Sequence, residues 1–311
     1  MKPFVKWAGG KSRLLYEIER RLPADFHEWE DVTYVEPFVG SGSVLFHMLK
    51  LHPNITHAVI NDINKVLMAS YEAIRDNPDE VYGSLELLWN EYNSLKSISA
   101  KSNFYYLCRD HFNGYKESLS RFSVTLFIFL NHTCFNGLYR ENARGLFNVP
   151  HGKYEKIRIC DRANLTQLSQ VLQKVDIRCG DFSGMLSDMI HESEQPGKHF
   201  IYADPPYRPI NRKASMFTQY DKSGFGDEDQ SKLKEFCDIL ARSGAQIMIS
   251  NSDSYVDEGS YFENLYQGYN IDRIEVTRMI NPYNSKNRRP KEVIITSYPI
   301  PQFNNPQLPL L

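Results

Sequence analysis

The chain has few cysteines, no long apolar run and almost no net charge. Its five cysteines, at positions 108, 134, 160, 179 and 237, form no Cys-x-x-Cys pair, which argues against a zinc site and indicates free thiols. The Pro-Cys dipeptide of enzymes that attack a base through cysteine is also absent. No stretch approaches the roughly 20 apolar residues of a membrane span, and the N-terminus lacks the apolar segment of a signal peptide. We therefore expect a cytoplasmic protein with no membrane partner.

The charge is small overall but unevenly distributed. The 311 residues carry a formal net charge of −2, yet residues 101–162 hold ten lysines and arginines against five acids, a local charge of +5. A second basic run, residues 284–291, contains no acid. Because clustered cations attract phosphates, both segments are candidates for nucleic-acid contacts. A solvated surface is the alternative for any single residue among them.

Seven short segments have the pattern of strands: 33–36, 58–61, 176–179, 199–203, 246–250, 271–277 and 292–298. Most are apolar at consecutive positions, as in strands covered on both faces, so the sequence predicts an α/β sheet with helices on both faces. The segment between the second and third strands is mainly helical in pattern and then rich in Asn and Gly. We assign it to an inserted domain, 66–175, and assign 1–65 and 176–311 to a catalytic domain. The tail from residue 299 is expected to be extended and peripheral.

A glycine-rich turn, Val-Gly-Ser-Gly-Ser at residues 39–43, follows the first predicted strand. Gly40 and Gly42 permit positive φ and close approach of a ligand, and Ser43 is a candidate helix N-cap. Leu45 stands where a dinucleotide-binding turn has its third glycine, which favours an adenosine without phosphates. Asp62 ends the second predicted strand 22 residues after Gly40, near the spacing of a carboxylate that binds ribose. A helix N-cap is the alternative role for Asp62.

The tetrapeptide Asp204-Pro205-Pro206-Tyr207 follows a buried apolar strand. The Asp204 carboxylate and the Pro205 carbonyl can both accept hydrogen bonds from a planar amino group, while Tyr207 stacks on its ring. Acceptors in this position hold the amine and stabilise the positive charge that builds on nitrogen during alkylation. The motif therefore predicts a site for an exocyclic amine, with a plain turn at the strand end as the alternative.

These motifs together resemble a Dam-type DNA adenine-N6 methyltransferase, of the alpha group of the D12 class. The opening residues 4–11, FVKWAGGK, are similar to the family's first motif, and 134–140, CFNGLYR, with 145–150, GLFNVP, resemble its DNA-reading hairpin. Four motifs in family order cover nearly the whole chain, so the resemblance is specific. It implies a Rossmann-like methyltransferase sheet and a mainly helical DNA-recognition insert with a hairpin.

The resemblance also assigns site residues. The opening motif closes over S-adenosylmethionine, and a lysine such as Lys11 suits its methionyl carboxylate. Asp181 and Phe182 take the usual place of contacts to the cofactor adenine, with a strand-end turn as the alternative. The expected cofactor-binding residues are Trp7, Lys11, Phe38, Gly40, Gly42, Asp62, Asp181, Phe182 and Asp204. The expected catalytic residues are Asp204, Pro205, Pro206 and Tyr207. The expected DNA-binding residues are Lys6, Phe135, Asn136, Leu138, Arg140, Asn142 and Pro150.

The implied reaction transfers a methyl group to N6 of an adenine flipped out of duplex DNA, because a paired base cannot present its amine. No metal is expected, since the leaving group is a neutral thioether. Arg140 suits guanine O6 and N7, Phe135 suits the gap left by the flipped base, and family members with this hairpin methylate GATC. A cognate restriction endonuclease is a candidate partner, and no obligate protein partner is expected. An RNA or protein-amide N-methyltransferase and a catalytically silent DNA-binding protein remain alternatives.

Overall fold

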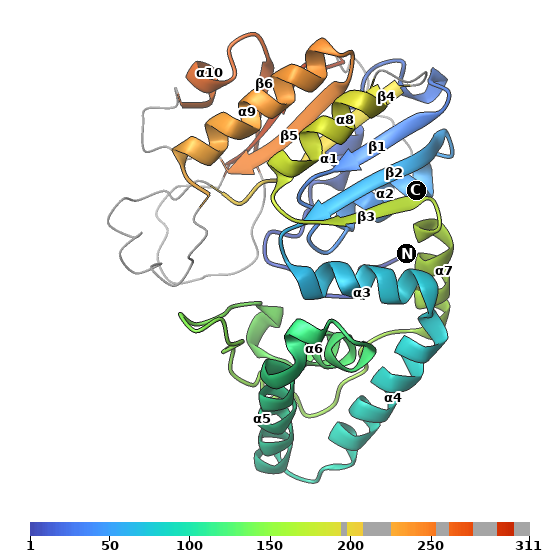
Figure 1. The fold of residues 1–311 in the computed structure, drawn as a ribbon, viewed down its shortest axis with the longest axis vertical. Helices are drawn as coiled ribbons and strands as arrows, with labels where there is room; N and C mark the ends of the chain where they lie inside the picture. Colours follow the sequence, from blue (N-terminus) through green and yellow to red (C-terminus); the bar gives the residue numbers. More distant parts are fainter. Residues whose placement is uncertain (194–197, 208–224, 253–260, 276–290, 302–311) are drawn as a thin grey trace.

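The structure is a computed structural model that describes residues 1–193, 198–207, 225–252, 261–275 and 291–301 (Figure 1). A sheet flanked by helices forms its upper part, and a smaller group of helices forms its lower part. The second basic run, apart from Lys291, and the tail beyond residue 301 lie outside the described residues. The expectations for those two segments stay predictions.

A seven-stranded sheet is the frame of the upper part. Its strands are β1 (Val32–Glu36), β2 (Ile55–Asp62), β3 (Val175–Cys179), β4 (Lys198–Ala203), β5 (Gln246–Ser252), β6 (Asn270–Glu275) and β7 (Lys291–Thr296). They lie in the order β3-β2-β1-β4-β5-β7-β6, in which β7 is antiparallel to both neighbours and the other pairs are parallel. All seven predicted strands are confirmed. The last one ends at residue 296, short of the predicted 298, and residues 276–277 fall outside the described part.

Alternate strand residues enter two separate cores, one on each face of the sheet. On β4, Phe200 and Tyr202 pack into the first core, and Ile201 and Ala203 pack into the second. Helices α1 (Leu15–Glu19), α2 (Ser43–Leu51) and α3 (Lys65–Asp76) cover the first face. Elements η4 (Phe182–Met185), α8 (Leu186–Ser193), α9 (Asp227–Arg242) and α10 (Tyr261–Leu265) cover the second. Burial on both faces explains the consecutive apolar residues of these strands.

The insert is mainly helical, as expected. It contains α4 (Pro78–Ser94), α5 (Ile98–Tyr115), η2 (Lys116–Ser118), α6 (Arg121–Thr133), η3 (Phe135–Gly137) and α7 (Arg162–Leu172). The short η1 (Phe26–Glu28) precedes β1. Helix α3 contacts β2 and β3 as well as α6, and the first core continues into the insert, where Tyr92, Tyr105 and Phe112 are buried. The sheet and the insert therefore share one core, and the domain division at 65/66 and 175/176 stays a prediction.

Within the described ranges, no helix combines the length and the apolar character that crossing a lipid bilayer demands.

Candidate active site

The sequence motifs meet at the carboxyl edge of the sheet. Gly40 lies in the turn after β1, Asp62 ends β2, and residues 204–207 follow β4. Because β1 lies between β2 and β4, the three segments are neighbours in space. A cleft of about 1740 Å³ opens between this edge and the insert. Pockets for one small ligand measure about 300–1,000 Å³, so the cleft has room for two.

Most of the residues expected to bind cofactor or to act in the reaction line this cleft. They are Trp7, Lys11, Phe38, Gly40, Asp62, Asp181, Phe182, Asp204, Pro205, Pro206 and Tyr207. Arg140 and Asn142 of the expected DNA-binding set line it too. The walls do not include Gly42, Lys6, Phe135, Asn136, Leu138 or Pro150.

The two loop glycines are required by the protein's own packing. Gly40 and Gly42 have φ values of 49° and 72°. A Cβ on Gly40 would approach the Trp7 ring to 2.8 Å, and one on Gly42 would approach the Tyr71 hydroxyl to 2.5 Å. The prediction that Ser43 caps the helix is wrong, because Gly42 is the N-cap of α2 and Ser43 is its first helical residue. Gly42 turns the chain into the helix, and of the two loop glycines only Gly40 lines the cleft.

Asp62 fastens the glycine loop to the end of β2. Its carboxylate accepts the Gly40 N–H at 3.1 Å and the Asn64 N–H at 2.9 Å. Burial raises the pKa of Asp62, and these N–H groups oppose that rise. The N-cap of α3 is Asn64, whose side chain accepts the Leu67 N–H, so the alternative role for Asp62 does not apply. Two accepted hydrogen bonds leave lone pairs on this carboxylate for a ribose hydroxyl, which stays its predicted partner.

Asp204 lies in a network that the sequence did not reveal. Its Oδ1 is 2.9 Å from Lys11 Nζ and accepts a hydrogen bond from Ser250 at 3.0 Å. Lys11 also donates to the Tyr207 hydroxyl and lies 4.4 Å from the centre of that ring. Glu292 on β7 accepts from the Tyr207 hydroxyl at 2.9 Å and lies 3.8 Å from Lys11. One buried lysine thus connects two carboxylates and the expected stacking tyrosine.

Burial raises the pKa of Asp204 to about 6, although Lys11 and Ser250 oppose the rise. A second buried acid, Glu36 at the end of β1, accepts a hydrogen bond from Tyr34 at 2.9 Å, and burial raises its pKa well above the usual value. The negative charge of Asp204 adds to that shift. Sequence reasoning missed Glu36, Ser250 and Glu292. The available signal was a charged or polar residue near one terminus of an apolar strand.

Aromatic side chains form the wall near β3. Phe38 lies 5.2 Å from Phe182 and 5.7 Å from Phe225, measured between ring centres. Phe182 is buried, as a stacking residue in a wall should be, and Phe225 was missed in the sequence. Asp181 is exposed and uses Oδ1 to accept the backbone N–H and the hydroxyl of Ser183, which caps η4. Asp181 therefore makes the strand-end turn and also reaches the cleft.

Asn131 of α6, a buried side chain, helps to fasten the opening motif to the insert. Asn131 accepts the Lys6 N–H at 2.8 Å and donates to the carbonyls of Lys6 at 2.8 Å and Gly137 at 3.1 Å. Trp7 then stacks on Tyr139 with 5.9 Å between ring centres. Asn131 and Tyr139 were both missed, because nothing local in the sequence marks a contact 125 residues away.

The segment 134–151 folds back on itself as an irregular hairpin. Isolated antiparallel bridges join Cys134 to His151 and Glu141 to Phe147, and the Phe135 N–H donates to the Pro150 carbonyl at 2.8 Å. The Asn142 side chain accepts the N–H groups of Arg144 and Leu146 and so shapes the tip.

Four residues of this hairpin that were expected to contact DNA are exposed: Phe135, Asn136, Leu138 and Arg140. Arg140 donates to Asn148 Oδ1 at 2.8 Å, which steadies its guanidinium. Lys6 is exposed beside them. Pro150 is exposed as well and supplies the carbonyl that closes the base of the hairpin.

The basic character of residues 101–162 is smaller than the count suggested. Arg121 and Arg162 pair with Glu80 and Asp79 of α4, which lie outside the counted segment. Lys101 is buried and donates to the Glu155 carbonyl. These three cations are therefore weaker candidates for phosphate contacts, and such contacts by the rest of the segment stay a prediction.

Comparison with known proteins agrees with this geometry. The family model for D12 class N6 adenine-specific DNA methyltransferase matches residues 7–280. Type II methyltransferase M.MjaIII of Methanocaldococcus jannaschii is 43% identical over 282 residues, which cover 90% of this chain and 93% of the relative. Type II methyltransferase M1.LlaDCHI of Lactococcus lactis subsp. cremoris is 33% identical and covers 96% of each chain. The DNA adenine methylase of Escherichia coli (strain K12) is 31% identical and covers 94% of each.

Proposed function

Because the chain belongs to the D12 class of N6 adenine-specific DNA methyltransferases, we propose that it methylates the adenine of GATC in duplex DNA, with that base flipped into the cleft. The enzyme is an adenine-specific DNA methyltransferase that uses S-adenosylmethionine. The observation that carries the finer proposal is an exposed hairpin beside a cleft that contains Asp204 and Tyr207. Duplex DNA is the substrate that needs both features.

The residues present fit the cofactor. Phe38, Phe182 and Phe225 offer aromatic surface for a flat ring, and Asp62 keeps lone pairs for a ribose. The bound cofactor supplies an electrophilic methyl group on a sulfonium. The chain's own task is to hold the acceptor nitrogen in line with it.

Asp204 and the Pro205 carbonyl accept the two N6 hydrogens, which orients the amine and stabilises its developing positive charge. Tyr207 stacks on the base, and its hydroxyl is held by Glu292. In the structure, the Lys11 ammonium lies 2.9 Å from Asp204 Oδ1, where the amino group of the base would have to lie. We propose that the entering amine replaces Lys11 there, and that Lys11 then serves the methionyl carboxylate. Lys11→Met should raise the KM for the cofactor, and an unchanged KM would contradict this exchange.

Recognition of the sequence belongs to the hairpin in this proposal. Arg140 presents a planar, steadied guanidinium suited to guanine, and the exposed ring of Phe135 suits the space left by the flipped adenine. GATC is supported by the family pattern of residues 134–150. Two relatives are named as type II methyltransferases, which supports a cognate endonuclease as partner. DNA as substrate supports action in the cytoplasm.

Arg140→Ala tests the base-reading role. A bidentate contact to guanine discriminates against the wrong base by about 1–3 kcal/mol, roughly 5- to 160-fold, whereas a phosphate contact affects every sequence alike. Methyl transfer should be compared on a GATC duplex and on duplexes with each base replaced in turn. We expect the variant to lose discrimination at one base pair and to retain most of its overall affinity for DNA.

The matched control is Arg144→Ala, which removes an exposed arginine from the same hairpin and should preserve discrimination. An equal loss on all duplexes for Arg140→Ala would make Arg140 a phosphate contact. A wild-type preference for another site would contradict GATC and leave the class of the enzyme unaffected.

A further inference from the structure

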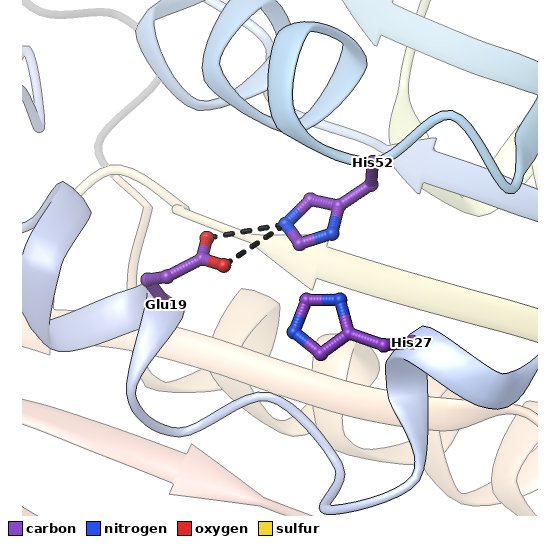
Figure 2. Close-up of side chains that lie close together, drawn as sticks. All are labelled: Glu19, His27 and His52. Carbon is purple, nitrogen blue, oxygen red and sulfur yellow. Dashed lines mark hydrogen bonds and ion pairs between the residues drawn. The ribbon is translucent and has the colours of Figure 1, made fainter. Parts of the chain in front are cut away.

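Three elements bring histidine and glutamate side chains together at the edge of the sheet where the strands begin. Glu19 is the last residue of α1, His27 lies in η1, and His52 is the C-cap of α2 (Figure 2). His52 is 1% exposed, while His27 is exposed. His47, within α2, contacts the same glutamate. Neither the reaction nor DNA recognition uses this group.

The spacing of the ligand atoms suits a metal ion. His52 Nε2 is 3.1 Å and 3.2 Å from the two oxygens of Glu19. Figure 2 shows both contacts as dashed lines. With bonds of about 2.0–2.1 Å, two ligands of a tetrahedral zinc ion stand about 3.3 Å apart. One ligand atom from each of Glu19, His27 and His52 lies within 4.8 Å of the other two. The exposed His27 ring therefore needs to move by only about 1–2 Å to complete three ligands.

The orientation of these groups is also suitable. The Glu19 carboxylate lies within hydrogen-bond distance of both His47 Nε2 and His52 Nε2, so two imidazoles fix its position. Within the described part of the chain, His52 Nδ1 has no hydrogen-bond partner. The polar contacts of this buried ring are therefore with Glu19 alone, and the ring is aimed at the carboxylate.

We propose that Glu19, His27 and His52 bind a divalent transition-metal ion of the zinc type, with His47 orienting the carboxylate from outside the first shell of ligands. Two imidazoles exclude Mg²⁺ and Ca²⁺, which take oxygen ligands, and favour Zn²⁺ or Co²⁺. Two histidines and one glutamate leave a fourth position for water. Contacts such as that from His47 fix the orientation of a ligand.

The ion would fasten α1, η1 and α2 to one another. It would not act in the reaction, because β2 separates His52 from Asp62, and the eight residues of that strand span roughly 25 Å. Its effect should therefore appear in binding and unfolding measurements and not in the rate of methyl transfer.

Titration of the full chain, stripped of metal and carrying no histidine tag, with Co²⁺ tests the site. We expect one ion per chain with the visible absorption of four-coordinate Co²⁺, no thiolate charge-transfer band, and displacement by Zn²⁺. Glu19→Gln and His27→Ala should each weaken binding by roughly 10-fold or more. His57→Ala is the matched control, because His57 lies 3.6 Å from Asp176 in an exposed histidine–carboxylate pair, and it should bind as the wild type does.

Thermal unfolding gives a second readout. Zn²⁺ should raise the Tm of the wild type and of His57→Ala but not that of His27→Ala, since binding to the folded state alone stabilises it. His27 is exposed, so His27→Ala should fold normally without metal. Equal affinity of wild type and His27→Ala, a thiolate band, or no binding at all would overturn the site.

Discussion

Asp204 has to accept a hydrogen bond from the adenine amine, so its protonation state limits the reaction. Burial raises its pKa to about 6, while Lys11 and Ser250 favour the ionised form. The carboxylate is therefore ionised above about pH 6 and neutral below it, which removes an acceptor at acid pH. Three groups from other segments act on this pKa: Lys11 in the opening motif, Ser250 on β5 and Glu292 on β7.

We expect kcat/KM for methyl transfer to fall as pH decreases through about 6, because this parameter reports the ionisation of the free enzyme. Initial rates at low DNA concentration between pH 5 and pH 8, in buffers of one ionic strength, measure the acid limb. A flat profile over this range would show that ionised Asp204 is not required.

Asp204→Ala should lack measurable turnover and retain specific DNA binding, since the hairpin is intact.

Glu292 positions Tyr207 and Lys11, and its negative charge raises the pKa of Asp204. Glu292→Gln keeps an oxygen for the Tyr207 hydroxyl and loses the charge, so the acid limb should move to lower pH. Glu292→Ala also releases Tyr207, and kcat should fall on the order of 10- to 100-fold because stacking is misplaced.

The control for Glu292 is Glu86→Gln, which alters the same kind of tyrosine–glutamate hydrogen bond, Tyr82 to Glu86, on α4. It should leave both the rate and the pH profile unchanged. An acid limb that stays in place in Glu292→Gln would show that this carboxylate is electrostatically remote from Asp204.

At the scale of elements, α6 connects the opening motif to the hairpin through Asn131. Asn131→Ala leaves the Lys6 N–H and two carbonyls without their partner, which costs about 1–3 kcal/mol of unfolding free energy. Because Lys6 and Gly137 are then no longer held together, we expect weaker discrimination among duplexes with little change in cofactor binding. Denaturant unfolding and the duplex panel measure the two effects.

Asn93→Ala is the control for Asn131→Ala, because it removes the same kind of side-chain-to-backbone hydrogen bonds. Asn93 of α4 makes the same two-sided contact with the backbone of Ile157, away from the opening motif. Asn93→Ala should lower the free energy of unfolding by a similar amount and preserve discrimination among the duplexes. If both variants discriminate equally well, Asn131 contributes stability alone.

At the scale of the whole molecule, the reaction and the proposed metal ion occupy opposite edges of one sheet. Methyl transfer from tritiated donor to duplex DNA should therefore proceed at an unchanged initial rate in EDTA, with label on adenine N6, since a sulfonium donor needs no Lewis acid. The same EDTA should lower the Tm if the ion is bound. A rate lost in EDTA and restored by Zn²⁺ would contradict this separation, and label on cytosine would contradict the chemistry.

The sequence by itself determined the strands and placed most of the expected site residues at one edge of the sheet. Seven segments had the pattern of strands, and most were apolar at consecutive positions, because strands buried on both faces are continuously apolar. Contiguous motifs placed Gly40, Asp62 and residues 204–207 at strand ends, and these residues do line one cleft. Such features are local, so neighbouring residues are enough to reveal them.

Only the tertiary structure decided which distant side chains meet. The strand order brings Glu292 to Tyr207 and Lys11 to Asp204, and Asn131 joins segments 125 residues apart. The cysteine spacing argued against a zinc site with cysteine ligands. Glu19, His27 and His52 come together only because α1, η1 and α2 pack on one face of the sheet. The N-cap of α2 is Gly42 and not the expected Ser43. This too depends on a distant residue, since Tyr71 leaves no room for a Cβ at position 42. Pairings of this kind depend on the packing of elements across the sheet, which no local pattern in the chain records.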